Sequence, residues 1–358
     1  MIKLAIVILN WNGIEYLRRF LPEVKKYSES EQNHLWIADN GSSDGSLKFL
    51  EDRFPDVRVL KFDKNYGFAG GYNKAFAEIN AEYYILLNSD VQVTPGWTEP
   101  LIRLMDNDTN VAACMPKIRD ITRRDYFEYA GAAGGFIDFL GYPFCRGRIF
   151  DVIEKDHGQY DDEREVFWAT GACMIVRGTH WHAAGGLDKK FFAHMEEIDL
   201  CWRLKNAGRK IMVCPSSVVY HLGGGTLPPY HPRKVFLNFR NSLLMLAKNL
   251  PRRRLWLILI RLGLDWISVM KFISAFSFAN AFAVVKAHFA FFGQLINKQL
   301  KKRAAGYLSD PSSATLSGGT AGNQSRAPEM HPEMYRRSIV IDFFIKGRRV
   351  FSRLRFGG

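Results

Sequence analysis

The sequence lacks the signatures of two common classes of nucleotide-binding protein. No GxxxxGK[ST] motif occurs anywhere, which excludes a Walker-type phosphate loop. The first predicted strand, residues 2–9, is followed by Asn10-Trp11-Asn12-Gly13 rather than by a GxGxxG turn. This absence argues against a dinucleotide-dependent oxidoreductase. Any nucleotide site in this chain must therefore be built in another way.

Cysteine is scarce, and no leader is recognisable. The five cysteines are an odd number without a CxxC pair, and they predict buried free thiols in a reducing compartment. The N-terminal run "IKLAIVILNW" has one lysine and no small-residue cleavage site, so it predicts a strand rather than a signal peptide. We therefore expect a protein of the cytosol or of the cytosolic face of a membrane.

Acidic residues are few in the last third of the chain. Residues 1–250 contain 31 Lys or Arg and 31 Asp or Glu, whereas residues 251–358 contain 18 basic and 5 acidic residues. The whole formal charge of +13 therefore belongs to the last third. This asymmetry indicates that the C-terminal region contacts an anionic surface, either a membrane or a nucleic acid.

Long apolar runs are also missing from this basic region. Its longest stretch without a charge, Phe272–Val285, has 14 residues, whereas a transmembrane helix needs about 20. We expect residues 251–305 to form basic amphipathic helices at the membrane interface, with a true span or a buried packing or dimer element as alternatives. Residues 306–330 predict a flexible linker, and residues 331–358 predict a basic segment that docks on the body or on lipid.

What the sequence does contain is a regular alternation over its first 120 residues. The predicted strands are 2–9, 35–39, 57–62 and 83–88, and the predicted helices are 13–28, 44–54 and 67–80. Such alternation predicts an α/β fold with helices on a mostly parallel sheet. We interpret residues 1–250 as one domain with three parts: a nucleotide-binding half (1–120), an irregular variable insertion (120–165) and an acceptor and catalytic half (166–250).

The second half has its own predicted elements. A strand is predicted at 166–178, and a helix begins near Met195 and ends at the Gly208 cap. Two further strands are predicted at 210–215 and 217–221.

Polar clusters follow the four predicted N-terminal strands. Ligands of open parallel sheets bind at the carboxyl ends of the strands. We therefore expect one polar crevice, formed by Asn10-Trp11-Asn12, Asp39–Asp44, Asn65-Tyr66-Gly67 and Asn88-Ser89-Asp90. Asp39 can accept a hydrogen bond from the ring N–H of uracil or thymine, although a turn and helix cap would need the same loop.

A second polar group is expected downstream. "HMEEIDLCWR" (194–203) places Glu196, Glu197 and Asp199 at a helix start, where acids also serve simply as partners of the helix dipole. His221 ends a predicted strand. A pairing of His221 with Asp90 would suit Mn²⁺ or Mg²⁺ that also holds phosphate oxygens.

In this order the elements resemble glycosyltransferase family 2, over about residues 3–226. The matching stretches are "VILNWNG", "ADNGSSDGS", "NYGFAGGYN", "LLNSD", "WATGACMIVR", "GGLDKKFFAHMEEIDLCWRLKNAG" and "VVYHLGGGT". The chain is most similar to the rhamnosyltransferase-like branch of bacterial surface polysaccharide synthesis. The resemblance implies a GT-A fold, a nucleotide-diphosphate sugar donor, a saccharide or lipid-linked saccharide acceptor, and inversion at the anomeric carbon.

The resemblance also implies which residues bind the donor. Asp39 would hold the nucleobase, and Asp90, at the end of the DxD position, would bind the divalent metal together with His221. Asn88 replaces the first acid of that motif, which predicts weaker metal binding. The remaining donor-binding residues are expected to be Asn10, Ser43, Asn65, Gly70, Trp168, Thr170 and Gly171.

The catalytic residues are implied in the same way. Glu197 stands at the usual Asp of the family's "ED" pair and would be the base, Glu196 would share that role, and Asp199 would orient the helix or the acceptor. The QxxRW motif of processive synthases is absent, and "FLNFRNSLL" (236–244) stands near its place. One sugar is therefore expected per binding event.

Other classes remain open. A sugar nucleotidyltransferase needs a Gly-rich, Arg- or Lys-bearing loop after its first strand, which "NWNG" does not supply. A membrane-associated scaffold with a decayed transferase domain is favoured only by Asn88 and Glu197. Nucleic-acid binding is disfavoured because the aromatic residues of the tail lie within apolar runs. We expect a peripheral enzyme on the cytoplasmic face of the cell membrane.

Overall fold

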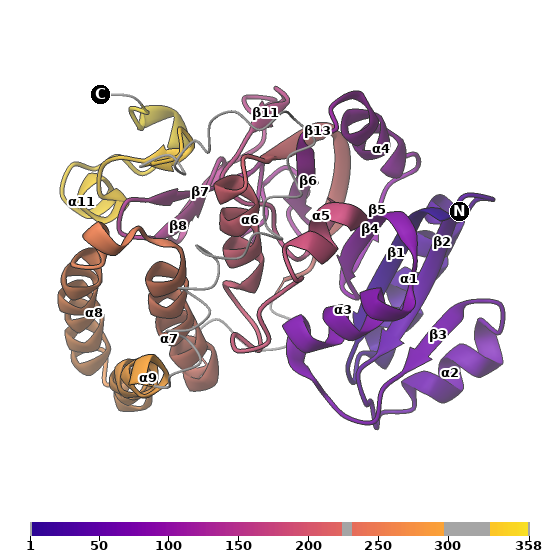
Figure 1. The fold of residues 1–358 in the computed structure, drawn as a ribbon, viewed down its shortest axis with the longest axis horizontal. Coiled ribbons are helices and arrows are strands. Elements are labelled where there is room, and N and C mark those ends of the chain that lie inside the picture. The colour runs from indigo at the N-terminus through magenta and orange to yellow at the C-terminus, as the bar shows by residue number, and fades with distance from the viewer. Residues whose placement is uncertain (1, 224–230, 297–329, 357–358) are drawn as a thin grey trace, which may run out of the picture.

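The computed structural model describes residues 2–223, 231–296 and 330–356 (Figure 1). A nine-stranded central sheet has the order β11-β13-β6-β12-β4-β1-β2-β3, and β5 pairs with β13. Its strands are β1 (Ile2–Asn10), β2 (Asn33–Asp39), β3 (Arg58–Lys61), β4 (Ala81–Asn88), β5 (Val91–Val93), β6 (Val111–Asp120), β11 (Arg164–Glu165), β12 (Cys173–Arg177) and β13 (Lys210–His221).

The N-terminal half follows the predicted alternation. Strands β4, β1, β2 and β3 pair in parallel, and most apolar residues of β4, β1 and β2 are buried because helices cover the sheet, whereas Val59 and Leu60 of the edge strand β3 are half-buried. In the first helix, Leu17, Phe20, Leu21 and Val24 are buried at helical spacing. The helices of this half are α1 (Ile14–Ser28), α2 (Ser46–Arg53), α3 (Gly67–Glu78) and α4 (Thr98–Asn107).

Beyond β4 the sheet is mixed, so the prediction of a mostly parallel sheet holds only for the N-terminal half. β12 is antiparallel to both of its neighbours, β4 and β6. Only residues 173–177 of the predicted strand 166–178 belong to β12. The two strands predicted at 210–215 and 217–221 are one strand, β13, with a shift of register between Cys214 and Val218. The helices here are α5 (Gly178–Ala183) and α6 (Glu196–Asn206).

The expectation of an irregular insertion at 120–165 is wrong, because this segment builds most of a second sheet. That sheet has the order β10-β9-β8-β7-β14, from β7 (Gly135–Asp138), β8 (Pro143–Cys145), β9 (Arg148–Ile149), β10 (Val152–Ile153) and β14 (Met334–Tyr335). Strand β14 comes from the C-terminal segment and pairs in parallel with β7. The segment 331–358 thus docks on the body through its described residues, which also include α11 (Ile339–Phe344).

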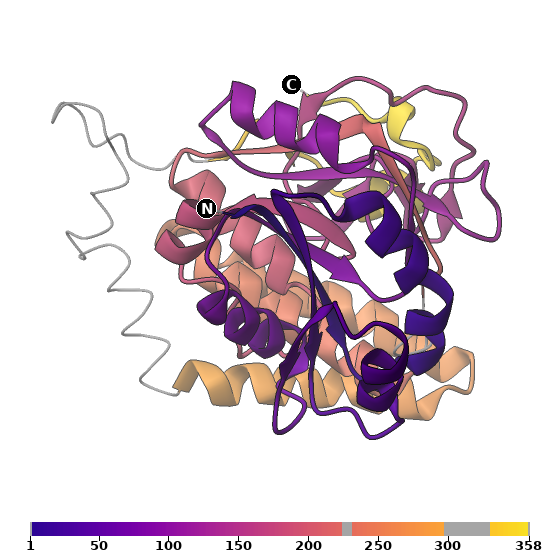
Figure 2. The ribbon, with the colours of Figure 1, turned by 90° about the vertical axis from the view of Figure 1, so that its right-hand side faces the viewer.

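Three long helices form a layer at the other end of the molecule from β3 (Figure 1). They are α7 (Pro232–Asn249), α8 (Leu257–Ser274) and α9 (Phe278–Ile296), with a short 3₁₀ turn at Arg252–Arg254. Figure 2 shows α9 side-on, as a long helix along the lower edge. In the described residues, none of the helices combines the length and apolar character that a membrane span requires. The predicted linker at 306–330 lies outside the described residues apart from Met330.

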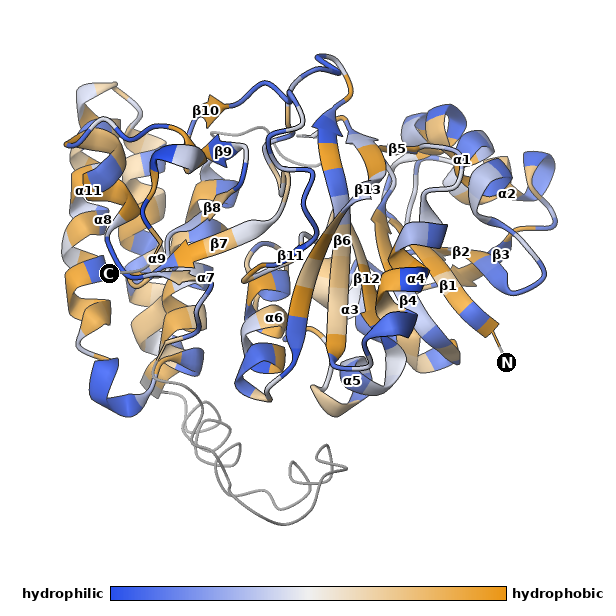
Figure 3. Ribbon diagram, turned by 90° about the horizontal axis from the view of Figure 1, so that it is seen from above, coloured by the Kyte–Doolittle hydropathy of each residue, from blue (hydrophilic) through white to orange (hydrophobic). Residues whose placement is uncertain are grey.

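A buried polar network joins α8 to α9 and to the second sheet. Arg261 donates from Nε to Asp265 at 2.9 Å, and His288 Nε2 lies 3.2 Å from the other Asp265 oxygen. The Arg261 guanidinium also lies 3.6 Å from the ring centroid of Tyr142. The two helices are therefore fixed to the body on their inner side, while apolar residues recur along their length (Figure 3). All five cysteines of the chain are buried and free.

Candidate active site

Strands β1 and β2 bring Asn10 and Asp39 together at their carboxyl ends. The two residues are partners in the parallel register, and Asn10 donates from Nδ2 to Asp39 Oδ2 at 3.0 Å. The other oxygen of Asp39 accepts the Ser42 N–H at 2.9 Å. Asp39 is fully buried. Each carboxylate oxygen retains a second lone pair, which is what recognition of a ring N–H would require.

The loops that follow β2 and β3 are held at the same edge of the sheet by side-chain hydrogen bonds. Ser43 donates its N–H to Asn12 at 2.8 Å. Asn65 accepts from Asn40 Nδ2 at 3.1 Å and from the Gly67 N–H at 2.7 Å. The side chain of Asn40 is buried. Sequence reasoning did not single out Asn40, although it follows Asp39 in the same polar cluster.

The glycines of the third loop are required by their surroundings. Gly67 has φ +73°, and a Cβ there would lie 2.6 Å from the Phe192 ring. A Cβ on Gly70 would lie 2.9 Å from Tyr66 Cβ. A side chain at Gly67 would push α3 away from the loop around Phe192, and a side chain at Gly70 would clash with Tyr66. Gly70, predicted to bind the donor, therefore also has a packing role.

A buried acid–histidine–acid group lies at the end of β4 and β13. His221 Nε2 lies 3.1 Å from Asp90 Oδ1, and His221 Nδ1 lies 3.3 Å from Glu128 Oε2. The Asn88 amide nitrogen is 3.5 Å from His221 Nε2. The predicted pairing of Asp90 with His221 is therefore close in space. Glu128 was missed, because it lies in the 120–165 segment, where no motif marked it.

Asp90 and Glu128, on either side of His221, favour the protonated and positively charged form of its ring. Burial alone lowers the pKa of His221, but the Glu128 and Asp90 carboxylates raise it to about 10. Asp90 and His221 supply the oxygen and nitrogen ligands that a manganese or magnesium ion accepts. In the part of the chain that the structure describes, no group of three or more His, Cys, Asp or Glu side chains is arranged to hold a metal. Because an imidazole that ligates a metal is neutral, an ion at Asp90 and His221 would have to displace the proton that the two acids favour on His221.

Glu196 and Glu197 begin α6 at a strained turn. Met195, at the N-cap, has φ 72°. Glu196 is buried, Glu197 is half-buried, and each has one buried carboxylate oxygen without a hydrogen-bond partner in the described structure. Burial raises the pKa of Glu197 to about 7, and burial together with the neighbouring Glu197 raises the pKa of Glu196 well above its usual value. With a pKa of about 7, Glu197 is able to accept a proton near neutral pH.

Asp199, in the same turn of α6, differs from both. It is fully buried, and it accepts from Arg203, Lys248 and Asn249, each at 2.8 Å. Burial raises the pKa of Asp199, but the charges of Arg203 and Lys248 outweigh this and hold it below its usual value. The contacts join α6 to α7, so Asp199 faces the helical layer and not the other candidate residues.

The segment 168–172 lies between Glu197 and the group formed by Asp90, His221 and Asn88. A Cβ on Gly171 would lie 3.9 Å from Glu197 Cβ, and the Ala172 carbonyl accepts the Asn88 N–H at 2.9 Å. Thr170 is buried, and its hydroxyl accepts the Ala172 N–H at 3.2 Å. Trp168 is directed elsewhere, since its indole N–H donates to the Phe136 carbonyl in the second sheet.

Asn241 of α7 organises the loop before the base. Its amide nitrogen lies 2.8 to 2.9 Å from the carbonyl oxygens of Phe191, Ala193 and His194. Phe192 and His194 have φ of 66° and 71°, so this loop contains strained backbone. Asn241 was not predicted as a site residue, although it belongs to the noted stretch "FLNFRNSLL". The signal was its position near the expected QxxRW motif.

Comparisons with known proteins agree with this geometry. The profile of "Glycosyl transferase family 2" matches residues 5–157. N-acetylglucosaminyl-diphospho-decaprenol L-rhamnosyltransferase of Mycobacterium tuberculosis is 30% identical over 236 residues, which cover 61% of this chain and 75% of that protein. Rhamnosyltransferase WbbL of Escherichia coli is 24% identical over 259 residues, 70% of this chain and 93% of that protein.

Solved structures of similar fold include one with a bound nucleotide. The crystal structure of GalNAc-T7 with UDP, GalNAc and Mn²⁺ superposes with a TM-score of 0.55 at 16% sequence identity. The match covers 69% of this chain and 48% of the other, so this chain spans about half of that protein's length.

Proposed function

The chain belongs to glycosyltransferase family 2, as its motifs predict, and has the mixed α/β fold of its GT-A relatives; we propose that it moves one sugar from a nucleotide-diphosphate sugar to an acceptor hydroxyl with inversion. The observation that carries this proposal is the state of Glu197. Its carboxylate has an oxygen without a partner in the described structure, a pKa of about 7, and a position beside Gly171. A general base works best when its pKa lies near the working pH.

The proposed reaction is a single in-line displacement. Glu197 takes the proton of the acceptor hydroxyl as the new C–O bond forms, and the nucleoside diphosphate leaves from the opposite face of the sugar. Glu196 lies directly beside the base, and its pKa is also raised, by burial and by the charge of Glu197. Asp199 positions α6 through its contacts with α7 and does not contact the reacting groups.

Donor binding is proposed at the carboxyl ends of the strands. Asp39, supported by Asn10, recognises the base, while the loops of Ser43, Asn65 and Gly70 line the crevice. Asp90 and His221 would hold a divalent ion, which when bound neutralises the charge that develops on the leaving diphosphate. Asn88 gives this site one acid fewer than the usual motif, so weak metal affinity is part of the proposal.

We propose a deoxyhexosyl or hexosyl donor and a saccharide or lipid-linked saccharide acceptor of cell-surface polysaccharide synthesis. The names of the Mycobacterium tuberculosis and Escherichia coli relatives, both rhamnosyltransferases, support this choice, and the first of them acts on a diphospho-decaprenol lipid by its name. An enzyme of such an acceptor would work at a membrane surface.

The outer faces of α8 and α9 are the proposed membrane contact, on the cytoplasmic side and without a span. Large apolar side chains are exposed there: Trp256, Leu259, Trp266, Ile267, Met270, Phe278, Phe282 and Phe289. Exposed apolar surface of this size marks an interaction site, and the positive charge of the last third of the chain favours anionic lipid.

Donor hydrolysis tests the proposed function directly. The full chain is incubated with a panel of nucleotide-sugars and Mn²⁺, and release of nucleoside diphosphate is measured. One donor should be turned over, and Asp90→Ala should reduce the rate about a hundredfold, as loss of a group that stabilises leaving-group charge does. Glu51→Gln, an exposed change on α2, is the matched control.

The second candidate is a non-catalytic scaffold, which the substitutions at Asn88 and Glu197 favour. The scaffold reading predicts no turnover of any donor by the unmodified protein. It also predicts that Asp90→Ala leaves vesicle binding as it is in the unmodified protein. Turnover that depends on Asp90 would rule the scaffold out.

A further inference from the structure

A pocket of about 650 Å³ lies between α7, α9 and the loop that precedes α6. The side chains that define it are Phe192, Arg233, Phe236, Arg240, Phe282 and Lys286. Phe236 and Arg240 lie one helical turn apart on α7, and Phe282 and Lys286 lie one turn apart on α9. The pocket is therefore a cleft between two helices with cationic and aromatic residues on both sides.

The cations of this pocket are available to an anion. Arg233 and Lys286 are exposed, and in the described residues no carboxylate oxygen forms an ion pair with either. The Arg240 guanidinium lies 5.2 Å, and the Lys286 ammonium 5.7 Å, from the ring centroid of Phe236. The positive charges of Arg240 and Lys286 thus lie over the ring of Phe236, and no carboxylate in the described residues pairs with them. A multiply charged anion would gain from both.

The pocket continues into an apolar stripe. Phe282 is 67% exposed, and Phe278 and Phe289, at 61% and 75%, lie on the same face of α9. A ligand that suits this arrangement has an anionic group in the pocket and a hydrocarbon chain along α9. A soluble nucleotide or a free saccharide would leave the stripe uncovered.

The pocket also adjoins the catalytic loop. Phe192, one of its walls, accepts the Phe68 N–H at 2.8 Å and stands four residues before Glu196. Arg240 donates to the carbonyl oxygens of Lys190 and Phe191 in the same loop. An anion bound to Arg233 and Lys286 therefore lies next to the loop that leads to Glu197 and next to the apolar stripe.

We propose that this pocket is the subsite for the diphosphate of a lipid-linked acceptor, with the first units of its hydrocarbon chain on the Phe282 stripe. The inference rests on the proposed function, since it supplies the acceptor half of that reaction. Arg233 and Lys286 bind the diphosphate oxygens. The sugar attached to the diphosphate then extends toward Glu197.

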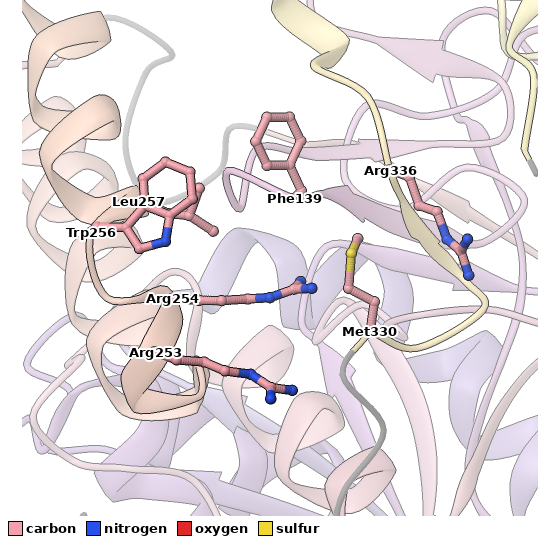
Figure 4. A pocket seen from close by; sticks show the side chains of 7 residues that line it. All are labelled: Phe139, Arg253, Arg254, Trp256, Leu257, Met330 and Arg336. Atoms are coloured by element: carbon pink, nitrogen blue, oxygen red, sulfur yellow. The ribbon is translucent and has the colours of Figure 1, made fainter. Parts of the chain in front are cut away.

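A second cationic pocket provides the competing location. It has a volume of about 400 Å³, and Arg253, Arg254 and Arg336 line it together with Trp256 (Figure 4). Its lining residues come from the turn before α8, from the second sheet and from the C-terminal segment. None of them belongs to α6 or to the loop before it, so an anion held there would lie outside the catalytic loop.

Binding of farnesyl diphosphate to the full chain tests the subsite without requiring turnover. The double variant R233Q/K286Q should weaken binding at least tenfold, whereas R103Q/K26Q, which removes the same charge from exposed positions of α4 and α1, should bind as the unmodified protein does. Farnesol and inorganic diphosphate, each lacking half of the ligand, should bind at least tenfold more weakly than farnesyl diphosphate. Unchanged binding by R233Q/K286Q, or a loss caused instead by R253Q/R336Q, would overturn the proposal.

Kinetic measurements distinguish a failure of this inference from a failure of the proposed function. With a lipid-diphosphate acceptor, R233Q/K286Q should raise the acceptor KM at least tenfold and change the donor KM less than twofold. An equal loss with a water-soluble saccharide acceptor would contradict the subsite. If no donor is turned over but farnesyl diphosphate binding depends on Arg233 and Lys286, the proposed function fails while the anionic-lipid site remains.

Discussion

The first turn of α6 carries three acids, and their pKa values are shifted in opposite directions. Glu196 and Glu197 have raised pKa values and oxygens without partners in the described structure, whereas Asp199 has a lowered pKa and three donors. All three are carboxylates on one short helix, so the amino acid alone does not decide the state. The difference comes from Arg203 on α6 and from Lys248 and Asn249 on α7, which all donate to Asp199. One helical turn can thus carry both acids with raised pKa values and a paired acid that anchors the helix.

Among the changes that test this difference between the acids, Glu197→Gln should have the largest effect on activity. Removal of a general base lowers kcat by about 10² to 10⁴-fold, and the glutamine is nearly the same size. Because the glutamine is neutral, it avoids the cost of a buried charge, so the Tm at pH 8 should equal or exceed that of the unmodified protein. Transfer kinetics and thermal unfolding check both parts. A variant that loses activity only because it unfolds would contradict the assignment.

Asp199→Asn should mainly reduce the stability of the protein, whereas Glu197→Gln mainly reduces its activity. The change at Asp199 leaves Arg203 and Lys248 without their shared acid, which costs about 3–5 kcal/mol when a buried pair is broken. Denaturant unfolding measures this loss. Asp52→Asn is the control, because its ion pair with Lys48 is exposed and such pairs contribute about 0–1 kcal/mol. Equal effects of the two changes would show that burial of Asp199 does not matter.

Asn241→Ala tests how far Glu197 depends on the loop that precedes it. The change frees three carbonyl groups before the base, and buried hydrogen bonds of this kind contribute about 1–3 kcal/mol when lost. The expected result is a kcat lowered about tenfold with little change in the donor KM. Asn238→Ala, on the same helix, is the matched control. A larger effect on the donor KM than on kcat would place Asn241 in donor binding instead.

The pH profile should report Glu197 itself. The base must be deprotonated, so kcat/KM should rise about tenfold per pH unit below pH 7 and level off above it. Because the folded pKa is raised above the usual 4.5, the folded state binds the proton more tightly. The contribution of Glu197 to stability is therefore present at low pH and is lost as pH rises from 4.5 through 7. A profile that is flat between pH 5 and 8 would exclude Glu197 as the base.

The sequence predicted what depends on local pattern. The strands of residues 1–120, the helix from Met195 and the closeness of Asp90 to His221 follow from periodicity and from the order of the motifs. The second sheet could not be foreseen, because its strands are two to four residues long and β14 joins β7 from about 200 residues away. Glu128 was missed for a related reason: its carboxylate meets His221 only through the folding of that segment.

Other features of the site depend on which neighbours surround a residue. Trp168 lies in a matching motif, yet its indole N–H bonds to the second sheet. Asp199 lies in the same helical turn as Glu196, yet its partners are Arg203 on α6 and, about 50 residues later, Lys248 and Asn249 on α7. Motif positions indicate the backbone location of a residue, and tertiary packing decides what its side chain contacts.

The strained loop before α6 has a consequence for how this protein can change over evolutionary time. Phe192, His194 and Met195 all hold left-handed backbone that glycine would adopt without penalty. Replacing one of them by glycine would relieve about 1–3 kcal/mol of strain, but it would add the backbone entropy of glycine to the unfolded state and would loosen the loop before Glu197. The strained loop is thus a place where selection for turnover opposes selection for a more relaxed backbone.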